Sequence, residues 1–251
     1  MYTAMIFAAG LGTRLKPLTD DRPKALVNFC GKSMLERTVE RLESFGFTRI
    51  VINIHHFPQL MREAILQLSK PGLELIVSDE SDILLDTGGG LKKAFEIIKP
   101  KGPVLLHNVD VLSDINFQHM LRTHQQEGAI ATLAVSRRET ARYFLWDNNR
   151  MCGWENIKTG DQILCRVSKN KPSRKAFSGI HIVSPEFANL IEETGKFSIT
   201  PLYLRLAAQH TIVSYEHNPA FWADLGSIEK LHKAETIYRS SPQTFDPYYY
   251  E

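Results

Sequence analysis

The sequence has few cysteines, no long hydrophobic run and no excess of one charge. Cys30, Cys152 and Cys165 are the three cysteines among 251 residues, and they lie far apart without a C-x-x-C pair. This pattern argues against a disulfide framework and a cysteine-based zinc site. No stretch of ~18 apolar residues suggests a membrane span, and Arg14 and Lys16 lie where a secretory signal needs its apolar run. These absences predict a cytoplasmic protein with no membrane partner.

The charge balance also limits the possible partners. Lys and Arg total 30 against 28 Asp and Glu, a net charge of +2. Nucleic-acid binding through a broad surface requires a concentrated basic face, and basic and aromatic residues do not alternate as in single-strand binders. We therefore expect no nucleic-acid partner. The 43% apolar content and 13 Phe are sufficient for a sizeable core, which excludes disorder as the main state.

In the first half, short apolar segments alternate with helical patterns. The expected strands are Thr3–Ala9, Arg49–Ile54, Leu73–Val77 and Pro103–His107. One expected helix begins at Ser33, and the others cover Pro58–Leu68, Gly90–Ile98 and Phe117–Gln125. Repeated strand–helix–strand units of this length predict parallel neighbouring strands and right-handed connections.

After Ala129 the pattern changes to short alternating segments, which are typical of antiparallel strands. The expected elements are strands at Ala131–Val135, Tyr143–Trp146, Ile163–Val167, Phe177–Val183 and Thr211–Tyr215, and helices at Pro185–Glu193, Pro201–Gln209 and Ser227–Tyr238. The chain is thus predicted to be α/β, a doubly wound, mostly parallel, Rossmann-like sheet with antiparallel additions in a three-layer sandwich. Residues 1–240 are expected to form a single domain, and residues 241–251 a C-terminal tail.

A glycine-rich loop follows the first expected strand, within Phe7–Arg14. Such a loop can present successive backbone N–H groups to phosphate oxygens. The dinucleotide-binding pattern requires a third glycine where Leu15 stands. A Walker A loop ending at Gly31–Ser33 requires glycine where Leu26 stands. Both mismatches argue against a dehydrogenase and a P-loop NTPase.

The pattern that remains is G-x-G-T-R-x-x-P-L-T, followed by R-P-K-A-L-V at Arg22–Val27. The run Ala8–Val27 closely resembles the opening motif of nucleotidyltransferases that join a nucleoside triphosphate to a sugar 1-phosphate. The resemblance extends over nearly the whole chain, through Glu80, Asp86–Gly90, Asn108–Val111, Phe177–Ile180 and Phe221–Gly226. Within the family, T-G-G-G and W-A-D-L-G look most like bacterial N-acetylmuramate-1-phosphate uridylyltransferases, with mannose- and heptose-1-phosphate guanylyltransferases as close relatives.

The resemblance implies the nucleotide-diphospho-sugar transferase fold and an enzyme that needs Mg²⁺. A sugar phosphate oxygen attacks the α-phosphorus of the NTP and pyrophosphate leaves. Because this nucleophile is already an anion near pH 7, positioning and cations are the main needs, and a general base is not required. The resemblance places Arg14 near the β- and γ-phosphates and Lys24 near the α-phosphate. Asp110 and Asp224 correspond to the metal ligands, and Arg14, Lys24 and Asp110 to the catalytic set.

The resemblance also implies two groups of binding residues. The expected nucleotide-binding residues are Ala9, Gly10, Gly12, Thr13, Arg14, Lys24, Glu80, Gly88 and Asn108, and the expected sugar-phosphate contacts are Gly179, Lys171 and Lys175. The glycine triplet that includes Gly88 precedes an expected helix. It is expected to expose free N–H groups to an anion or a base edge.

Three departures from the family leave the substrate open. Val109 stands where many relatives have glycine and is expected to narrow the approach to the ribose or sugar. Asn170 and Ser198 replace charged residues found in some relatives on the sugar side. The favoured function is transfer from UTP to an N-acetylated amino-sugar 1-phosphate. GTP with mannose or heptose 1-phosphate, and a non-catalytic nucleotide- or sugar-binding relative, are the alternatives. The sequence does not fix the oligomeric state.

Overall fold

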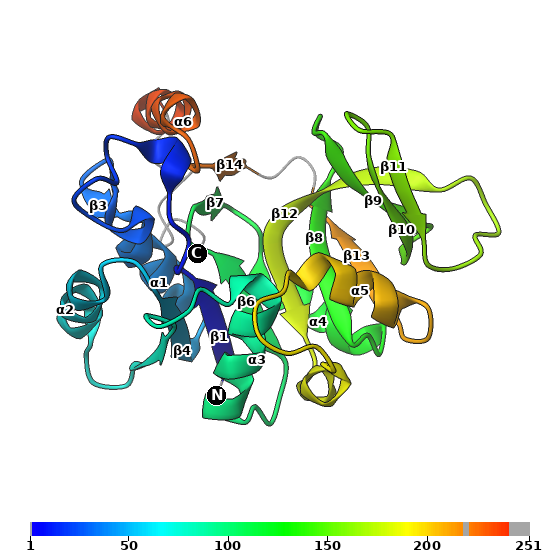
Figure 1. Cartoon of the computed structure of the whole chain (residues 1–251), viewed down its shortest axis with the longest axis horizontal. Coiled ribbons are helices and arrows are strands. Elements are labelled where there is room, and N and C mark those ends of the chain that lie inside the picture. Colours follow the sequence, from blue (N-terminus) through cyan, green and yellow to red (C-terminus); the bar gives the residue numbers. More distant parts are fainter. Residues whose placement is uncertain (1, 218–220, 241–251) are drawn as a thin grey trace.

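The computed structural model describes residues 2–217 and 221–240. Four parallel strands lie in the order β6-β1-β4-β5 and form one end of a 10-stranded sheet (Figure 1). Their bounds are β1 Tyr2–Phe7, β4 Phe47–Ile54, β5 Glu74–Asp79 and β6 Val104–Asn108. Because parallel strands share a direction, the loops that follow their carboxyl ends gather at one edge of the sheet.

The second half of the chain extends this sheet with mixed strands. β12 pairs antiparallel with β6 and with β8, and β13 pairs parallel with β8. Beyond them β10 pairs with β13, β9 and β11. The bounds are β8 Ala131–Ser136, β9 Arg142–Asp147, β10 Arg150–Asn156, β11 Asp161–Leu164, β12 Ser173–Val183 and β13 Ile212–Glu216.

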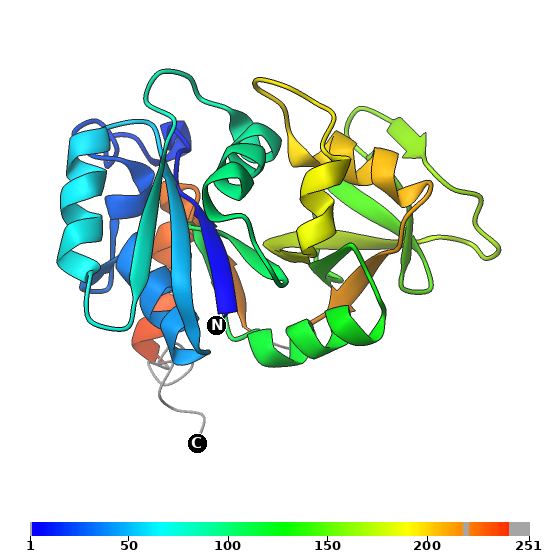
Figure 2. The same ribbon diagram turned by 90° about the horizontal axis from the view of Figure 1, so that it is seen from below.

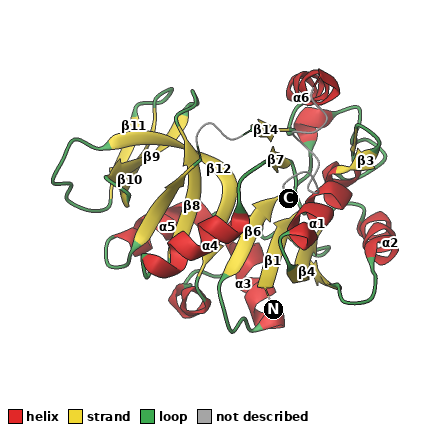
Figure 3. Cartoon of the chain, turned by 180° about the vertical axis from the view of Figure 1, so that it is seen from behind, coloured by secondary structure: helices red, strands yellow, loops and turns green. Residues whose placement is uncertain are grey.

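Helices cover both faces of the sheet (Figures 2 and 3). One face carries α1 Met34–Ser44, α2 Pro58–Leu68, α4 Phe117–Gln126 and α6 Ile228–Ser240; the other carries α3 Asp86–Ile98, α5 Ile199–Ala207 and the 3-10 helix η3 Pro185–Leu190. Alternate residues of the strands, such as Ile6 and Phe7 of β1, enter two separate apolar clusters, one beneath each helical layer. The predicted three-layer α/β sandwich is confirmed.

Several short elements lie close to the loops at the carboxyl edge. They are the 3-10 helices η1 Thr13–Leu15 and η2 Lys24–Leu26 and the strand pairs β2 Asn28–Phe29 with β3 Lys32–Ser33 and β7 Val111–Ser113 with β14 Trp222–Asp224. In the β7–β14 pair, Asp224 lies opposite Val111. The N–H of Leu225 donates to the carbonyl oxygen of Asp110 at 2.7 Å. This ribbon therefore brings two aspartates from distant parts of the sequence together.

Some predicted boundaries were wrong. The expected helix at 185–193 is the 3-10 helix η3, which ends at Leu190, and the strand expected at 163–167 is β11, which ends at Leu164. The helix expected from Gly90 begins at Asp86. β10 was not predicted, because its register shift between Met151 and Gly153 interrupts the alternation that identifies a strand.

The described residues of both halves contribute to the same large sheet. The predicted tail, residues 241–251, lies outside the described residues, and the division into a domain of residues 1–240 and a tail stays a prediction. None of the described helices has the length and apolar character needed to cross a membrane.

Candidate active site

The glycine loop after β1 folds closely over Lys24. Gly12 has a φ of 66°, in the left-handed region that favours glycine. A Cβ added there would lie 2.9 Å from the Cβ of Lys24 and 3.0 Å from Cγ2 of Thr19. The hydroxyl of Thr19 donates to the carbonyl oxygen of Gly12 at 3.0 Å. Backbone conformation and packing thus both require glycine at this position.

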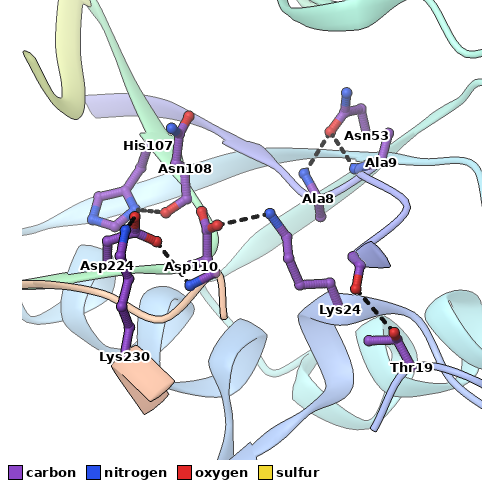
Figure 4. A network of polar contacts seen from close by, with 12 residues as sticks. Ala8, Ala9, Thr19, Lys24, Asn53, His107, Asn108, Asp110, Asp224 and Lys230 are labelled. Carbon is purple, nitrogen blue, oxygen red and sulfur yellow. Dashed lines mark hydrogen bonds and ion pairs between the residues drawn. The ribbon is translucent and has the colours of Figure 1, made fainter. Parts of the chain in front are cut away.

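A buried polar chain fixes the start of the loop. Asn53, at the end of β4, is 3% exposed, and its Oδ1 accepts the N–H groups of Ala8 at 2.7 Å and Ala9 at 3.2 Å (Figure 4). Its Nδ2 donates to Glu80 at 2.8 Å, and the second oxygen of Glu80 accepts the N–H of Leu85 at 3.1 Å. Burial raises the pKa of the Glu80 carboxyl, against the effect of these hydrogen bonds. The carboxyl ends of β1, β4 and β5 are therefore tied together.

Lys24 and Asp110 form an ion pair at the end of the glycine loop. Nζ of Lys24 lies 3.0 Å from Oδ2 of Asp110, and the two side chains are 15% and 11% exposed (Figure 4). Lys24 begins η2, whereas Asp110 follows β6. A Cβ added at Gly10 would lie 3.5 Å from Nζ of Lys24. The ammonium group is thus held beside the loop backbone.

Gly226 marks the point where three charged groups converge. A Cβ added there would lie 2.8 Å from Oδ1 of Asp224 and 2.9 Å from both Nη2 of Arg14 and Oδ2 of Asp110. Burial acts to raise the pKa of Asp224, but hydrogen bonds from Lys230 and the Gly226 N–H, with the charges of Lys230 and Arg14, lower it. Asp224 is therefore held as a carboxylate beside Asp110.

The two aspartates fit one kind of metal site. The described residues contain no group of three or more His, Cys, Asp and Glu side chains that could hold a metal ion. Mg²⁺ commonly binds through one or two protein carboxylates and takes its other ligands from water and substrate phosphates. The pair Asp110 and Asp224 therefore fits a magnesium ion that binds together with a nucleotide.

A cavity of about 480 Å³ opens at this edge of the sheet. Most of the predicted nucleotide-binding and catalytic residues line it, namely Ala9, Gly10, Gly12, Thr13, Arg14, Lys24, Glu80, Asn108 and Asp110. Cavities of this size commonly hold small-molecule ligands. The predicted set is thus assembled around a space suited to a nucleotide.

The predicted sugar-phosphate contacts are not among the residues that line this cavity. Nζ of Lys175 is 2.9 Å from Oε2 of Glu216, and its side chain is 11% exposed. Lys171 lines a separate groove on the outer strands, together with Arg174. Gly179 has a φ of 75°, and an added Cβ would lie 2.9 Å from Nδ2 of Asn108. The side chain of Asn108 therefore fills the space that the lack of a side chain at Gly179 leaves.

The glycine triplet has a different role from the one expected. Gly88 and Gly89 lie in the first turn of α3, and their N–H groups donate to the carbonyl oxygen of Phe197 at 2.9 and 3.2 Å. A Cβ at Gly88 would lie 2.3 Å from the Phe197 ring. The expectation of free N–H groups here is wrong, since a neighbouring segment of the chain takes them. Gly88 as a nucleotide contact stays a prediction.

Comparison with known proteins identifies the family. Residues 3–150 match the model of a family described as "Nucleotidyl transferase". The N-acetylmuramate alpha-1-phosphate uridylyltransferase of Caulobacter vibrioides is 33% identical over 240 residues, which cover 92% of this chain and 95% of that protein. This chain belongs to the nucleotidyl transferase family. It is a sugar-1-phosphate nucleotidyltransferase, as the resemblance implied.

Other relatives and solved structures agree on the family and the fold. The N-acetylmuramate alpha-1-phosphate uridylyltransferase of Neisseria meningitidis is 30% identical over 239 residues, 93% of this chain and 97% of that protein. The mannose-1-phosphate guanyltransferase of Yarrowia lipolytica is 29% identical, over 97% of this chain and 66% of that protein. The structure of HddC from Yersinia pseudotuberculosis complexed with GMP-PN has a TM-score of 0.72 at 20% identity, over 95% of this chain and 100% of that chain.

Sequence reasoning missed several residues of this nucleotidyltransferase site. Asn53 and Gly226 hold other groups in place, and Lys196 lines the cavity from the segment before α5. A polar residue at the end of an apolar strand, as Asn53 is, was a usable signal. Val109 lies in the core, 1% exposed, and is not among the residues that line the cavity. The expected narrowing of the approach to the ribose or sugar by Val109 is therefore not seen.

Proposed function

We propose that this nucleotidyltransferase transfers UMP from UTP to N-acetylmuramate 1-phosphate, giving UDP-N-acetylmuramate and pyrophosphate, with Mg²⁺ as cofactor. The observation that carries the chemistry is the convergence of Arg14, Lys24, Asp110 and Asp224 at one end of the cavity. The choice of substrates is supported by two uridylyltransferase relatives, which match this chain over 95% and 97% of their own length.

The reaction exchanges one phosphoanhydride linkage for another. An oxygen of the sugar 1-phosphate attacks the α-phosphorus of UTP, and the bond from that phosphorus to the bridging oxygen of the β-phosphate breaks. The leaving pyrophosphate carries the electron pair of that bond. Because the attacking oxygen is already anionic, the protein has to align two polyanions and balance the charge that moves to the leaving group.

Two cations have roles in that alignment. Arg14 binds the β- and γ-phosphates, where its planar guanidinium can donate two parallel hydrogen bonds. Lys24 binds the α-phosphate as a compact charge, exchanging part of its contact with Asp110 for phosphate oxygens. The loop from Ala9 to Thr13 lets the phosphates approach the backbone closely, and the Asn53–Glu80 chain keeps that loop in place.

Asp110 and Asp224 would hold the magnesium ion. When bound, Mg²⁺ neutralises phosphate charge and orients the triphosphate. Lys230, which pairs with Asp224, and the N–H of Gly226 keep one of these carboxylates in position. Asn108, at the end of β6, lies against the same cavity, where its amide can reach the ribose or the acceptor.

A second candidate is transfer from GTP to mannose or heptose 1-phosphate. It is favoured by guanyltransferase relatives that match 97% of this chain. It is less favoured than the first because this chain covers only 66% of that relative, whereas it covers nearly all of the uridylyltransferases.

The test is pyrophosphate release in a panel of four NTPs crossed with the 1-phosphates of N-acetylmuramate, N-acetylglucosamine, mannose and a heptose. We expect the highest kcat/KM for UTP with N-acetylmuramate 1-phosphate, and loss of turnover when EDTA removes Mg²⁺. Preference for GTP with mannose or heptose 1-phosphate would establish the second candidate instead. Turnover that persists unchanged in EDTA would contradict the metal assignment.

A further inference from the structure

Arg138 has an unusual environment for a charged side chain. It follows β8, and its guanidinium carbon lies 4.1 Å from the centroid of the Trp222 ring. One Nη donates to the carbonyl oxygen of Phe177, and the buried Nε has no hydrogen-bond partner. Within the described part of the chain, Arg138 takes part in no ion pair with a carboxylate.

This leaves a half-buried positive charge that no carboxylate of the described residues pairs with directly. Burial lowers the pKa of Arg138, against the attraction of Asp224 and Tyr143. A charge held partly out of water is costly unless an opposite charge or several hydrogen bonds compensate it. Lys175, on the neighbouring β12, has such compensation from Glu216. The N–H groups on the Nη atoms of Arg138 that do not donate to Phe177 can donate to a carboxylate or phosphate group of a ligand.

The surroundings of Arg138 indicate that its charge serves the acceptor and not the nucleotide. Arg138 is not among the residues that line the nucleotide cavity. Trp222, which supports it, lies on β14 two residues before Asp224, so the two side chains share one side of the strand. Two residues along a strand span about 7 Å. The indole Nε1 donates to the carbonyl oxygen of Ser178 at 2.8 Å, which fixes the ring on the β12 side of the site.

We propose that Arg138 binds the carboxylate of the lactyl ether of N-acetylmuramate 1-phosphate and so selects this acceptor. The inference rests on the proposed function. N-acetylglucosamine 1-phosphate is the same molecule without that ether. Arg14 and Lys24 are assigned to the phosphates of the NTP and the two aspartates to the magnesium ion. The carboxylate is the anionic group that N-acetylmuramate 1-phosphate has and N-acetylglucosamine 1-phosphate lacks, and none of these residues is assigned to it. The sugar ring separates its C1 phosphate from its C3 substituent by a span of the same order as the step along β14.

The test compares two acceptors in one variant. For Arg138→Ala with UTP, we expect kcat/KM for N-acetylmuramate 1-phosphate to fall about 10- to 100-fold, mainly through KM, as for a lost hydrogen bond to a charged group. The value for N-acetylglucosamine 1-phosphate should change by less than about threefold, because that acceptor lacks the carboxylate. Arg138→Lys keeps the charge without the planar fork and should recover part of the loss. Arg137→Ala, at an adjacent side chain that is 77% exposed, is the matched control.

The outcomes separate this inference from the proposed function. An equal loss with both acceptors, or no loss with either, would overturn the role of Arg138, and thermal midpoints show whether the variants fold. Should Arg138→Ala fail to fold, the same comparison of the two acceptors is made with Arg138→Lys. The expected fall in kcat/KM for N-acetylmuramate 1-phosphate is then smaller. If the wild-type protein does not use UTP with N-acetylmuramate 1-phosphate, the proposed function fails, and this inference with it. If it does and Arg138→Ala keeps the wild-type preference, only the inference fails.

Discussion

Lys24 has a carboxylate partner within the protein, although its expected ligand is a phosphate. The 3.0 Å pair with Asp110 holds the ammonium at the glycine loop. A lysine side chain that was free in solvent would lose rotamer freedom when it bound a phosphate, and this pair reduces that loss because the side chain is already ordered. Gly10 and Gly12 leave room for this side chain, because a Cβ at Gly12 would lie 2.9 Å from the Cβ of Lys24. The individual residues of the loop therefore serve to position one cation.

Replacing Lys24 with alanine should lower kcat by about 10²- to 10³-fold, the loss typical of removing one preorganised group that stabilises transition-state charge. The measurement is pyrophosphate release, with circular dichroism to check that the fold is kept. Lys16→Ala is the control, since Lys16 lies on the same loop, is 63% exposed and forms an ion pair with Asp20 at 3.3 Å. It should retain turnover within about twofold. Near wild-type turnover in Lys24→Ala would remove Lys24 from the mechanism.

At the scale of elements, α3 shows how a glycine run can serve packing within the protein. Glycine costs about 1 kcal/mol relative to alanine inside a helix, so three in one turn disfavour the helix locally. A Cβ at Gly89 would lie 2.3 Å from the carbonyl oxygen of Gly195, and one at Gly90 would lie 2.7 Å from Oε1 of Glu80. The absence of side chains lets α3 approach both the segment before α5 and the Asn53–Glu80 chain. Contacts with the rest of the molecule offset the poor helix propensity.

Gly90→Ala should therefore destabilise the protein by about 1–3 kcal/mol, because the methyl group displaces Glu80 from Asn53. Urea unfolding measures this change, and KM for the NTP should rise in the same variant because the glycine loop loses its support. Gly102→Ala is the matched control, since a Cβ there meets nothing within 4 Å. Equal stability of the two variants would contradict a packing role for Gly90.

At the scale of the whole molecule, buried histidines distributed over the sheet and its helical layer share one electrostatic property. Burial lowers the pKa of His107, His124 and His217 to about 4 and that of His181 to about 3. The hydroxyls of Thr132 and Ser184 contact the two ring nitrogens of His124 at 2.8 and 3.0 Å. Such histidines are neutral in the folded state and gain protons more readily in the unfolded state.

The free energy of unfolding should consequently fall as the pH is lowered from about 6.5 toward 4. A histidine with a lowered pKa contributes stability above its unfolded pKa and loses it as the pH falls through its folded pKa. Between pH 7.5 and pH 5 the loss should be about 2 kcal/mol for each such group. Urea titrations at several pH values test this, and His124→Gln should show a shallower dependence. A profile that is flat over this range would contradict the assignment.

Much of the parallel half of the fold was predictable from local patterns. The alternation of apolar runs with helical periodicity located β1, β4, β5 and β6 to within a few residues. β1, β4 and β6 are buried on both faces over most of their length, which gives nearly continuous apolar runs. β10 and the first turn of α3 were not predictable in this way. A bulge at Met151–Gly153 breaks the alternation in the first, and the glycines conceal the helix in the second.

By itself, the sequence determined the α/β class, the glycine loop and the presence of Arg14 and Lys24 beside it, since these features depend on neighbours within about 20 residues. The resemblance implied that Asp110 and Asp224 meet, and the tertiary structure places them together beside Gly226. Only the tertiary structure decided that Lys175 is paired with Glu216, whereas Arg138 has no carboxylate partner among the described residues. The physical reason is distance along the chain. Whether a charge is free or compensated depends on side chains that folding brings from tens of residues away, and no local pattern records those contacts.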